Sequence, residues 1–305
     1  MSRVRELLAW CRDHRGHLVL VAVVAAIGVV SALSAYRLNG TVYATLIGTD
    51  GSMRSVSFSL QAMHELEYLV FQPDGLRSLI AVVPAPQGGN SAFVTRTKGA
   101  PPELLIGNTD GVETRVVAVG EVSDPRWSPQ GTSIAFATRD DAVEEISPEA
   151  WVVVRAVEQG DTLTVGRGYE PHPSPSQRTF ALTSRGIALL SYSDAPPSIV
   201  VASPVPVPLS TPFAVSQDGT RLAWVAPADR SLQVFEEKDG YFVPLILEKT
   251  FIPETMTFSP DGAYLLGTTH TDATTTVSVF TITTGRVRAL GEFNGFMRLL
   301  TWSNE

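Results

Sequence analysis

Side chains that could do chemistry are few and scattered in this sequence. No two of the five histidines have the close spacing typical of metal ligands on one element. These are His14, His17, His64, His172 and His270. His172 stands between two prolines and is predicted to be a surface residue of a loop. No Gly-x-Ser-x-Gly nucleophile elbow occurs. We therefore predict no catalytic residue, no metal site and no cofactor.

An acidic cluster offers the clearest candidate for binding. It consists of Asp140, Asp141, Glu144 and Glu145. It lacks the alternating oxygen ligands and the central glycine of a calcium loop. Two interpretations remain: a solvated loop, or an acidic rim for a basic partner segment whose binding weakens as salt rises. The connections at residues 83–91, 139–150 and 269–275 are the longest, and we expect all three to share this binding face.

Composition excludes several classes of protein. The chain has 305 residues and a formal net charge of −8, so no basic surplus is available for nucleic acid. Cys11 is the single cysteine, which rules out a disulfide within one chain.

An uncharged apolar segment near the N-terminus predicts a membrane helix. Residues 18–36 carry no charge and as a helix would span roughly 28 Å, close to the thickness of a bilayer. Basic residues concentrate before this segment, which predicts an N-terminus inside the cytoplasm. We expect a cytoplasmic segment (residues 1–16), a signal anchor (17–36) and an extracytoplasmic domain (37–305). A cleaved signal peptide, cut near Ala32-Leu33-Ser34, is the alternative.

A short turn phrase recurs through the rest of the chain. Residues 258–262 give the full form, Phe-Ser-Pro-Asp-Gly, with variants at residues 71–75, 127–131, 173–177 and 215–219. The chain ends on Thr301-Trp302-Ser303, the start of another copy. Successive copies are 56, 46, 42, 43 and 44 residues apart. A period in the low forties predicts a β-propeller with one four-stranded blade per repeat.

The phrase has a physical role in a turn. Proline presets φ at the first corner, Asp or Gln caps the turn, and glycine supplies a positive φ. The residues given this role are Pro73, Asp74, Gly75, Pro129, Gly131, Asp218, Gly219, Pro260, Asp261 and Gly262. An apolar run follows each phrase, for example residues 133–138 and 221–225. We predict that these runs are the innermost strands of the blades.

Two leftover ends predict how the ring closes. Residues 41–47 and 53–58 precede the first repeat, and residues 296–302 follow the last complete one. We expect them to combine into a sixth blade, which removes exposed sheet edges. An open ring or a seven-bladed ring is the alternative.

The phrase and the strand after it resemble the WD40-like propeller repeats of the TolB family. The propeller domains of prolyl oligopeptidase relatives contain the same phrase. The resemblance covers roughly residues 40–305 and implies a fold more than a function, although TolB-like propellers act mostly as binding platforms. This chain departs from the family pattern because a membrane anchor replaces the separate N-terminal domain.

The function expected from these patterns is a non-enzymatic scaffold that binds a protein or an envelope component. An envelope enzyme or small-ligand sensor that uses the channel mouth is the alternative. A membrane-tethered subunit of a larger machine is a third possibility. The proline-rich residues 203–208 suit either an extended docking edge or an irregular outer strand protected from edge pairing.

Overall fold

The computed structural model describes residues 38–49, 53–63, 66–68, 77–86, 89–108, 113–139, 150–175, 177–192 and 196–303. The chain divides into two compact units, and the second, Gly40–Glu305, contains every described strand. The predicted membrane anchor lies outside the described residues. Among the described residues, no helix has the length and apolar character needed to cross a bilayer.

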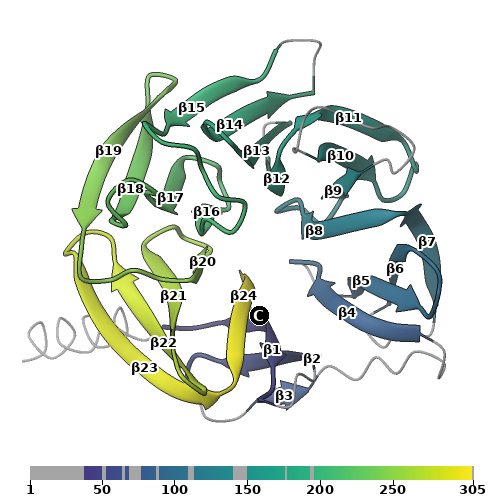
Figure 1. Cartoon of the computed structure of the whole chain (residues 1–305), viewed down its shortest axis with the longest axis horizontal. Helices are drawn as coiled ribbons and strands as arrows, with labels where there is room; N and C mark the ends of the chain where they lie inside the picture. The colour runs from purple at the N-terminus through teal and green to yellow at the C-terminus, as the bar shows by residue number, and fades with distance from the viewer. Residues whose placement is uncertain are drawn as a thin grey trace, which may run out of the picture. The chain divides into compact units, whose positions relative to one another are not determined.

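The second unit is an all-β propeller of six blades arranged in a ring (Figure 1). Each blade is an antiparallel sheet of four strands. The first contains β4 (Arg77–Pro84), β5 (Asn90–Thr97), β6 (Pro102–Asn108) and β7 (Thr114–Val119). The second contains β8 (Glu121–Trp127), β9 (Ser133–Arg139), β10 (Trp151–Ala156) and β11 (Thr162–Arg167).

The third to fifth blades repeat the same order. The third contains β12 (Tyr169–Ser174), β13 (Arg178–Thr183), β14 (Gly186–Ser191) and β15 (Ser198–Ala202). The fourth contains β16 (Phe213–Val215), β17 (Arg221–Val225), β18 (Leu232–Lys238) and β19 (Tyr241–Glu248). The fifth contains β20 (Thr255–Phe258), β21 (Tyr264–Thr271), β22 (Thr274–Thr281) and β23 (Arg286–Asn294).

The sixth blade joins the two ends of the propeller, as predicted. Its strands, from the axis outward, are β24 (Phe296–Ser303), β1 (Thr41–Ile47), β2 (Met53–Ser59) and β3 (Glu67–Tyr68). The last strand of the chain pairs antiparallel with the first, from Thr41 opposite Ser303 to Ile47 opposite Phe296. This pairing closes the ring and gives β1 a neighbour on each side, with β24 as the innermost strand of the blade.

The innermost strands are not the apolar runs that the sequence indicated. The strands nearest the axis are β4, β8, β12, β16, β20 and β24 (Figure 1). The runs at residues 133–138 and 221–225 form β9 and β17, which are second in their blades. A second strand has a sheet neighbour on each side and another blade on each face, so it is buried most completely. An innermost strand borders the channel and can carry prolines and charges.

The turn phrase therefore joins the first strand of a blade to the second. In the first blade this connection follows Pro84, where Ala85 donates its backbone N–H to Asn90 at 2.9 Å. Ser128 makes the equivalent bond to Ser133 at 2.8 Å. The phrase at residues 71–75 lies outside the described residues. It precedes β4 in the sequence, whereas the other copies follow the first strand of their blade. Counting from Ala85 brings the first interval from 56 to 43 residues.

The full phrase forms a tight turn fixed by side-chain hydrogen bonds. The Ser259 hydroxyl donates to Asp261 Oδ1 at 2.6 Å, and the same carboxylate accepts the N–H of Ala263 at 3.0 Å. Gly262 adopts φ +67°, in the left-handed region that L side chains rarely occupy. These bonds and this conformation hold the two strands at the hairpin spacing.

Apolar layers between blades form the core, and polar side chains cross some of the junctions. Trp127 donates its indole N–H to the carbonyl of Val83 at 2.7 Å, from the second blade to the first. Arg178 binds both carboxylate oxygens of Glu237, at 3.0 and 3.2 Å, from the third blade to the fourth. Such crossings fix the blade order and leave the inner strands facing a central channel.

Candidate functional site

Two cavities lie along the axis of the propeller, and Arg126 of β8 borders both. We call the first the narrow end: its volume is about 90 Å3, and all six innermost strands line it near their C-terminal ends. We call the second the wide mouth: its volume is about 920 Å3, and residues of five innermost strands (β8, β12, β16, β20 and β24) line it. The wide mouth has the size of a ligand pocket, whereas the narrow end has room for a small group only.

The walls of the wide mouth are largely apolar and rich in proline. They include Pro208, Leu209, Pro212, Phe213, Pro227, Ile252, Pro253, Met256 and Phe296. The proline-rich stretch begun at Ser203 is therefore not an outer strand, since β15 ends at Ala202 and the chain then crosses inward to β16. Its later residues form one wall of the mouth, where Leu209 is 47% exposed.

Two neighbouring innermost strands carry the same acidic–proline–basic pattern at the floor of this mouth. β8 contains Asp124-Pro125-Arg126, and β12 contains Glu170-Pro171-His172. Asp124 and Glu170 both have positive φ, 51° and 46°, and each lies at a break in strand register. Non-glycine residues in this region are uncommon, and they concentrate at functional sites. The shared bulge directs both carboxylates toward a single partner on β24.

That partner is Arg298. Its Nη2 lies 2.8 Å from Asp124 Oδ1 and 2.9 Å from Glu170 Oε1, joining the closing strand to the second and third blades. Burial alone would lower the pKa of Arg298, but the two carboxylates raise it above its usual value. Burial raises the pKa of Glu170, although Arg298 opposes this shift. The floor of the wide mouth is therefore a compact ionic cluster with both signs of charge.

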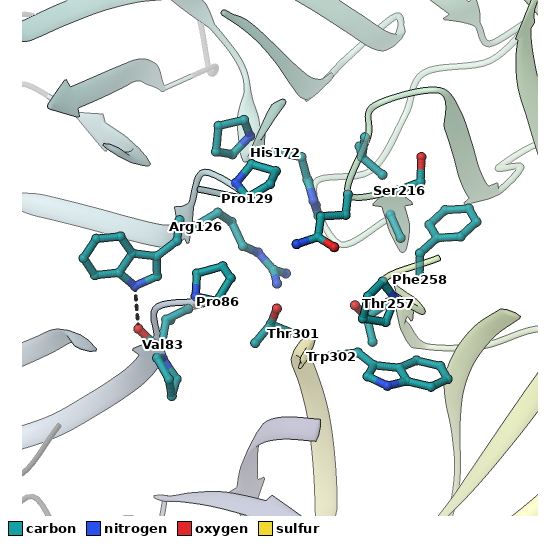
Figure 2. A pocket seen from close by; sticks show the side chains of 17 residues that line it. Val83, Pro86, Arg126, Pro129, His172, Ser216, Thr257, Phe258, Thr301 and Trp302 are labelled. Carbon is teal, nitrogen blue, oxygen red and sulfur yellow. Dashed lines mark hydrogen bonds between the residues drawn. The ribbon is translucent and has the colours of Figure 1, made fainter. Parts of the chain in front are cut away.

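The narrow end has a different charge. Among the described residues that line it, Arg126 is the only Asp, Glu, Lys or Arg, and its guanidinium extends into the middle of the cavity (Figure 2). Burial lowers the pKa of Arg126, with nearby Glu170 opposing this shift. Thr257 and Thr301 add hydroxyl groups to the lining.

His172 also lines the narrow end, which corrects its prediction as a surface residue. Its ring packs edge-on against Phe213, with centroids 4.6 Å apart. Its Nε2 is buried and has no hydrogen-bond partner among the described residues. Burial, together with Arg126 and Arg298, holds the pKa of His172 well below 6.5, so the imidazole is neutral near pH 7. The acidic–proline–basic pattern shared by residues 124–126 and 170–172 was the signal in the sequence that could have placed His172 at the channel.

The acidic residues predicted as a binding rim, Asp140, Asp141, Glu144 and Glu145, lie outside the described residues. Among the described residues, the connection at residues 272–273 joins β21 to β22 and lies on the side of the wide mouth. The connection after Pro84 joins a first strand to a second and lies on the opposite side. These two connections therefore do not share one face, contrary to the expectation for all three.

Metal ligands do not gather in the described part of the chain: no group of three or more His, Cys, Asp or Glu side chains could hold an ion there.

Comparison with known proteins supports the fold. No protein-family profile matches the chain, and no curated protein matches it in sequence. Among solved structures, TolB from Acinetobacter baumannii aligns with a TM-score of 0.68 at 14% identity, over 90% of this chain and 70% of TolB. The chain has a TolB-like six-bladed fold.

Other propellers show how little this fold says about activity. A chain in a nidogen/laminin complex aligns with a TM-score of 0.58 at 11% identity, over 87% of this chain and 98% of that chain. A puromycin-hydrolyzing peptidase from Mycobacterium tuberculosis aligns with a TM-score of 0.56 at 18% identity, over 84% of this chain and 45% of the peptidase. Because binding proteins and enzymes both use this architecture, function must be argued from the site.

Proposed function

We propose that this chain is a membrane-anchored, extracytoplasmic propeller that binds a protein segment or an envelope component in the wide mouth of its channel. The observation that carries the proposal is the mouth itself, about 920 Å3 in volume, with apolar walls and a charged floor. Such a combination favours a ligand with an apolar body and polar groups that pair at the bottom of the pocket. The non-repeating segment that includes Leu209 gives this mouth its individual shape.

The membrane part of the proposal rests on the sequence. The uncharged segment at residues 18–36 is long enough to span a bilayer, and basic residues precede it. An anchor of this kind would hold the propeller at the outer surface of the cytoplasmic membrane, within reach of envelope proteins.

A site-specific photo-crosslinker tests where a partner binds. The full-length protein is produced in its native membrane with the crosslinking residue in place of Leu209, which is 47% exposed in the mouth. The matched control carries it in place of Leu247, which is 57% exposed on the outer strand β19. We expect a discrete covalent adduct from position 209 and none of the same mass from position 247.

Two results would contradict the proposal. Equal adducts from both positions would place the contact elsewhere on the propeller. An absence of adducts from position 209, with the protein folded and in the membrane, would exclude a macromolecular partner in the mouth. Peptide mapping of the adduct identifies the bound segment.

An envelope enzyme is a second candidate, favoured by the shifted pKa values of Glu170 and His172 at the channel. Buried groups of this kind are common in active sites, although structural ion pairs produce similar shifts. The purified full-length chain is screened for hydrolase and lyase activity, with and without divalent metals. Turnover that disappears in Glu170→Gln, with an unchanged thermal midpoint, would replace the scaffold function by an enzymatic one.

A further inference from the structure

A buried cation and a histidine with an unpartnered ring nitrogen line the same small cavity at the narrow end. Arg126 extends toward the channel axis, with His172 to one side and Thr301 to another (Figure 2). His172 Nε2 is sealed from solvent and has no hydrogen-bond partner among the described residues. A buried polar atom without a partner is costly, so a native cavity that contains one invites a ligand to complete it.

The charge that lines this cavity indicates the charge of a ligand that would bind there. Asp124 and Glu170 lie close enough to Arg126 to act on its pKa, but both bind Arg298 in the wide mouth and neither lines the narrow end. Burial keeps the pKa of Arg126 below its usual value despite these carboxylates. An anion next to the guanidinium would offset this desolvation and favour the charged form.

The size of the cavity and the hydrogen-bond donors that line it indicate the chemical class of the ligand. A volume of about 90 Å3 accommodates a few waters or one planar anionic group, but not a folded element. A guanidinium presents two parallel N–H donors that match a carboxylate, and a neutral imidazole can donate from Nε2. The hydroxyls of Thr257 and Thr301 add further donors.

We propose that the narrow end of the channel is a carboxylate-binding site formed by Arg126, His172 and the two threonine hydroxyls. The carboxylate belongs either to a small free acid or to the end of a chain that enters through the wide mouth. The inference takes the channel as the binding region, as in the proposed function, but its test uses no protein partner. A negative result in the carboxylate test would therefore not contradict the proposed function, and a negative crosslinking result would not contradict the carboxylate site.

Thermal unfolding of the full-length protein in detergent tests the site, with sodium acetate replacing sodium chloride at constant ionic strength. For a site with a Kd of about 1 mM, 100 mM acetate should raise the midpoint by about 5 °C. Arg126→Gln should abolish the increase, and Arg126→Lys should keep only part of it. The matched control is Arg221→Gln, which loses an ion pair to Glu236 at 3.1 Å but no cavity residue, and should respond like the native chain.

His172→Phe provides a second variant in case Arg126→Gln fails to fold. Phenylalanine retains the ring contact with Phe213 and removes Nε2, so the half-saturating acetate concentration should rise several-fold. Equal acetate shifts in the native chain, both Arg126 variants and His172→Phe would overturn the proposal. So would an absence of any acetate shift in the native chain.

N-acetyl-alanyl-alanine and its C-terminal amide distinguish the two sources of carboxylate. If the acid acts at lower concentration than acetate and the amide does not act, the site binds a chain terminus. If acetate and the peptide acid act equally, the site binds a free small acid. A peptide amide as effective as the acid would contradict carboxylate recognition.

Discussion

The two ends of the channel are built from different kinds of sequence. The narrow end is bounded by the turn phrases and the C-terminal ends of all six innermost strands, so it reflects the repeat. The wide mouth is bounded by segments that differ from blade to blade, including the proline-rich entry to β16 and the region around Pro253. The repeat thus supplies a scaffold with a uniform cavity, and the departures from it supply shape and mixed charge.

Of the changes considered, removal of Arg298 should reduce the free energy of unfolding most, because it leaves two carboxylates at the floor of the wide mouth without their cation. We expect Arg298→Ala to lower the free energy of unfolding by about 2–3 kcal/mol, less than a fully buried pair because the mouth admits some water. Urea unfolding of the full-length protein measures this change.

Two comparisons control for the loss. Arg288→Ala, at an exposed position of the outer strand β23, should change stability by less than about 0.5 kcal/mol. Combining Arg298→Met with Asp124→Asn and Glu170→Gln should restore part of the stability, since no unpaired charge remains. A single-variant loss as small as that of Arg288→Ala would show that the cluster contributes little.

The turn-phrase side should be sensitive to backbone conformation and space. Gly219 has φ +76°, and an added Cβ would lie 2.9 Å from Ser174 Cβ in the neighbouring blade. Gly131 has φ +67°, but its added Cβ would come no closer than 3.8 Å to Ala85. We expect Gly219→Ala to cost about 2 kcal/mol and Gly131→Ala about 1 kcal/mol in chemical denaturation. Equal losses would show that the blades adjust to remove the close approach.

The narrow end should also give a pH dependence. His172 has a lowered pKa, so the unfolded chain takes up a proton below about pH 6.5 while the folded chain resists it. The contribution of His172 is therefore fully present above pH 6.5 and decreases below it, by up to about 1.4 kcal/mol per pH unit. The raised pKa of Glu170 acts oppositely, because its folded form gains a proton first as pH falls.

A comparison of the native chain with His172→Phe isolates the histidine. Urea unfolding between pH 7.5 and pH 5 should show a steeper loss of stability in the native chain than in the variant. Parallel pH profiles would mean that His172 reaches solvent and titrates normally in the folded state.

The smallest expected effect concerns the acidic residues between β9 and β10. Changing Asp140, Asp141, Glu144 and Glu145 to lysine should slow association with a basic partner several-fold and weaken the dependence on salt. Surface binding kinetics with the partner identified by crosslinking measure both changes. Unchanged association rates and salt dependence would show that these four residues are only a solvated loop.

Repetition made the fold readable from the sequence. The residue types in the phrase that contains Asp261 and Gly262 predict a tight turn, and the spacing between copies of the phrase gives the length of one blade. The leftover ends predicted the closing sheet because a strand without a partner must find one. The order of strands within a blade was misread, because an apolar run indicates burial on both faces and not distance from the axis.

The sequence by itself therefore determined the turns and the repeat period, and it favoured a six-bladed ring closed by its two ends, because these features depend on local or periodic patterns. Only the tertiary structure decided the site. Arg298 lies 174 residues from Asp124 and 128 from Glu170, and no local pattern relates them. His172 resembles a loop residue in sequence, yet the register break in β12 and the ring of six innermost strands place it beside the channel. Such sites form where strands distant in sequence meet, so their chemistry is a property of ring closure.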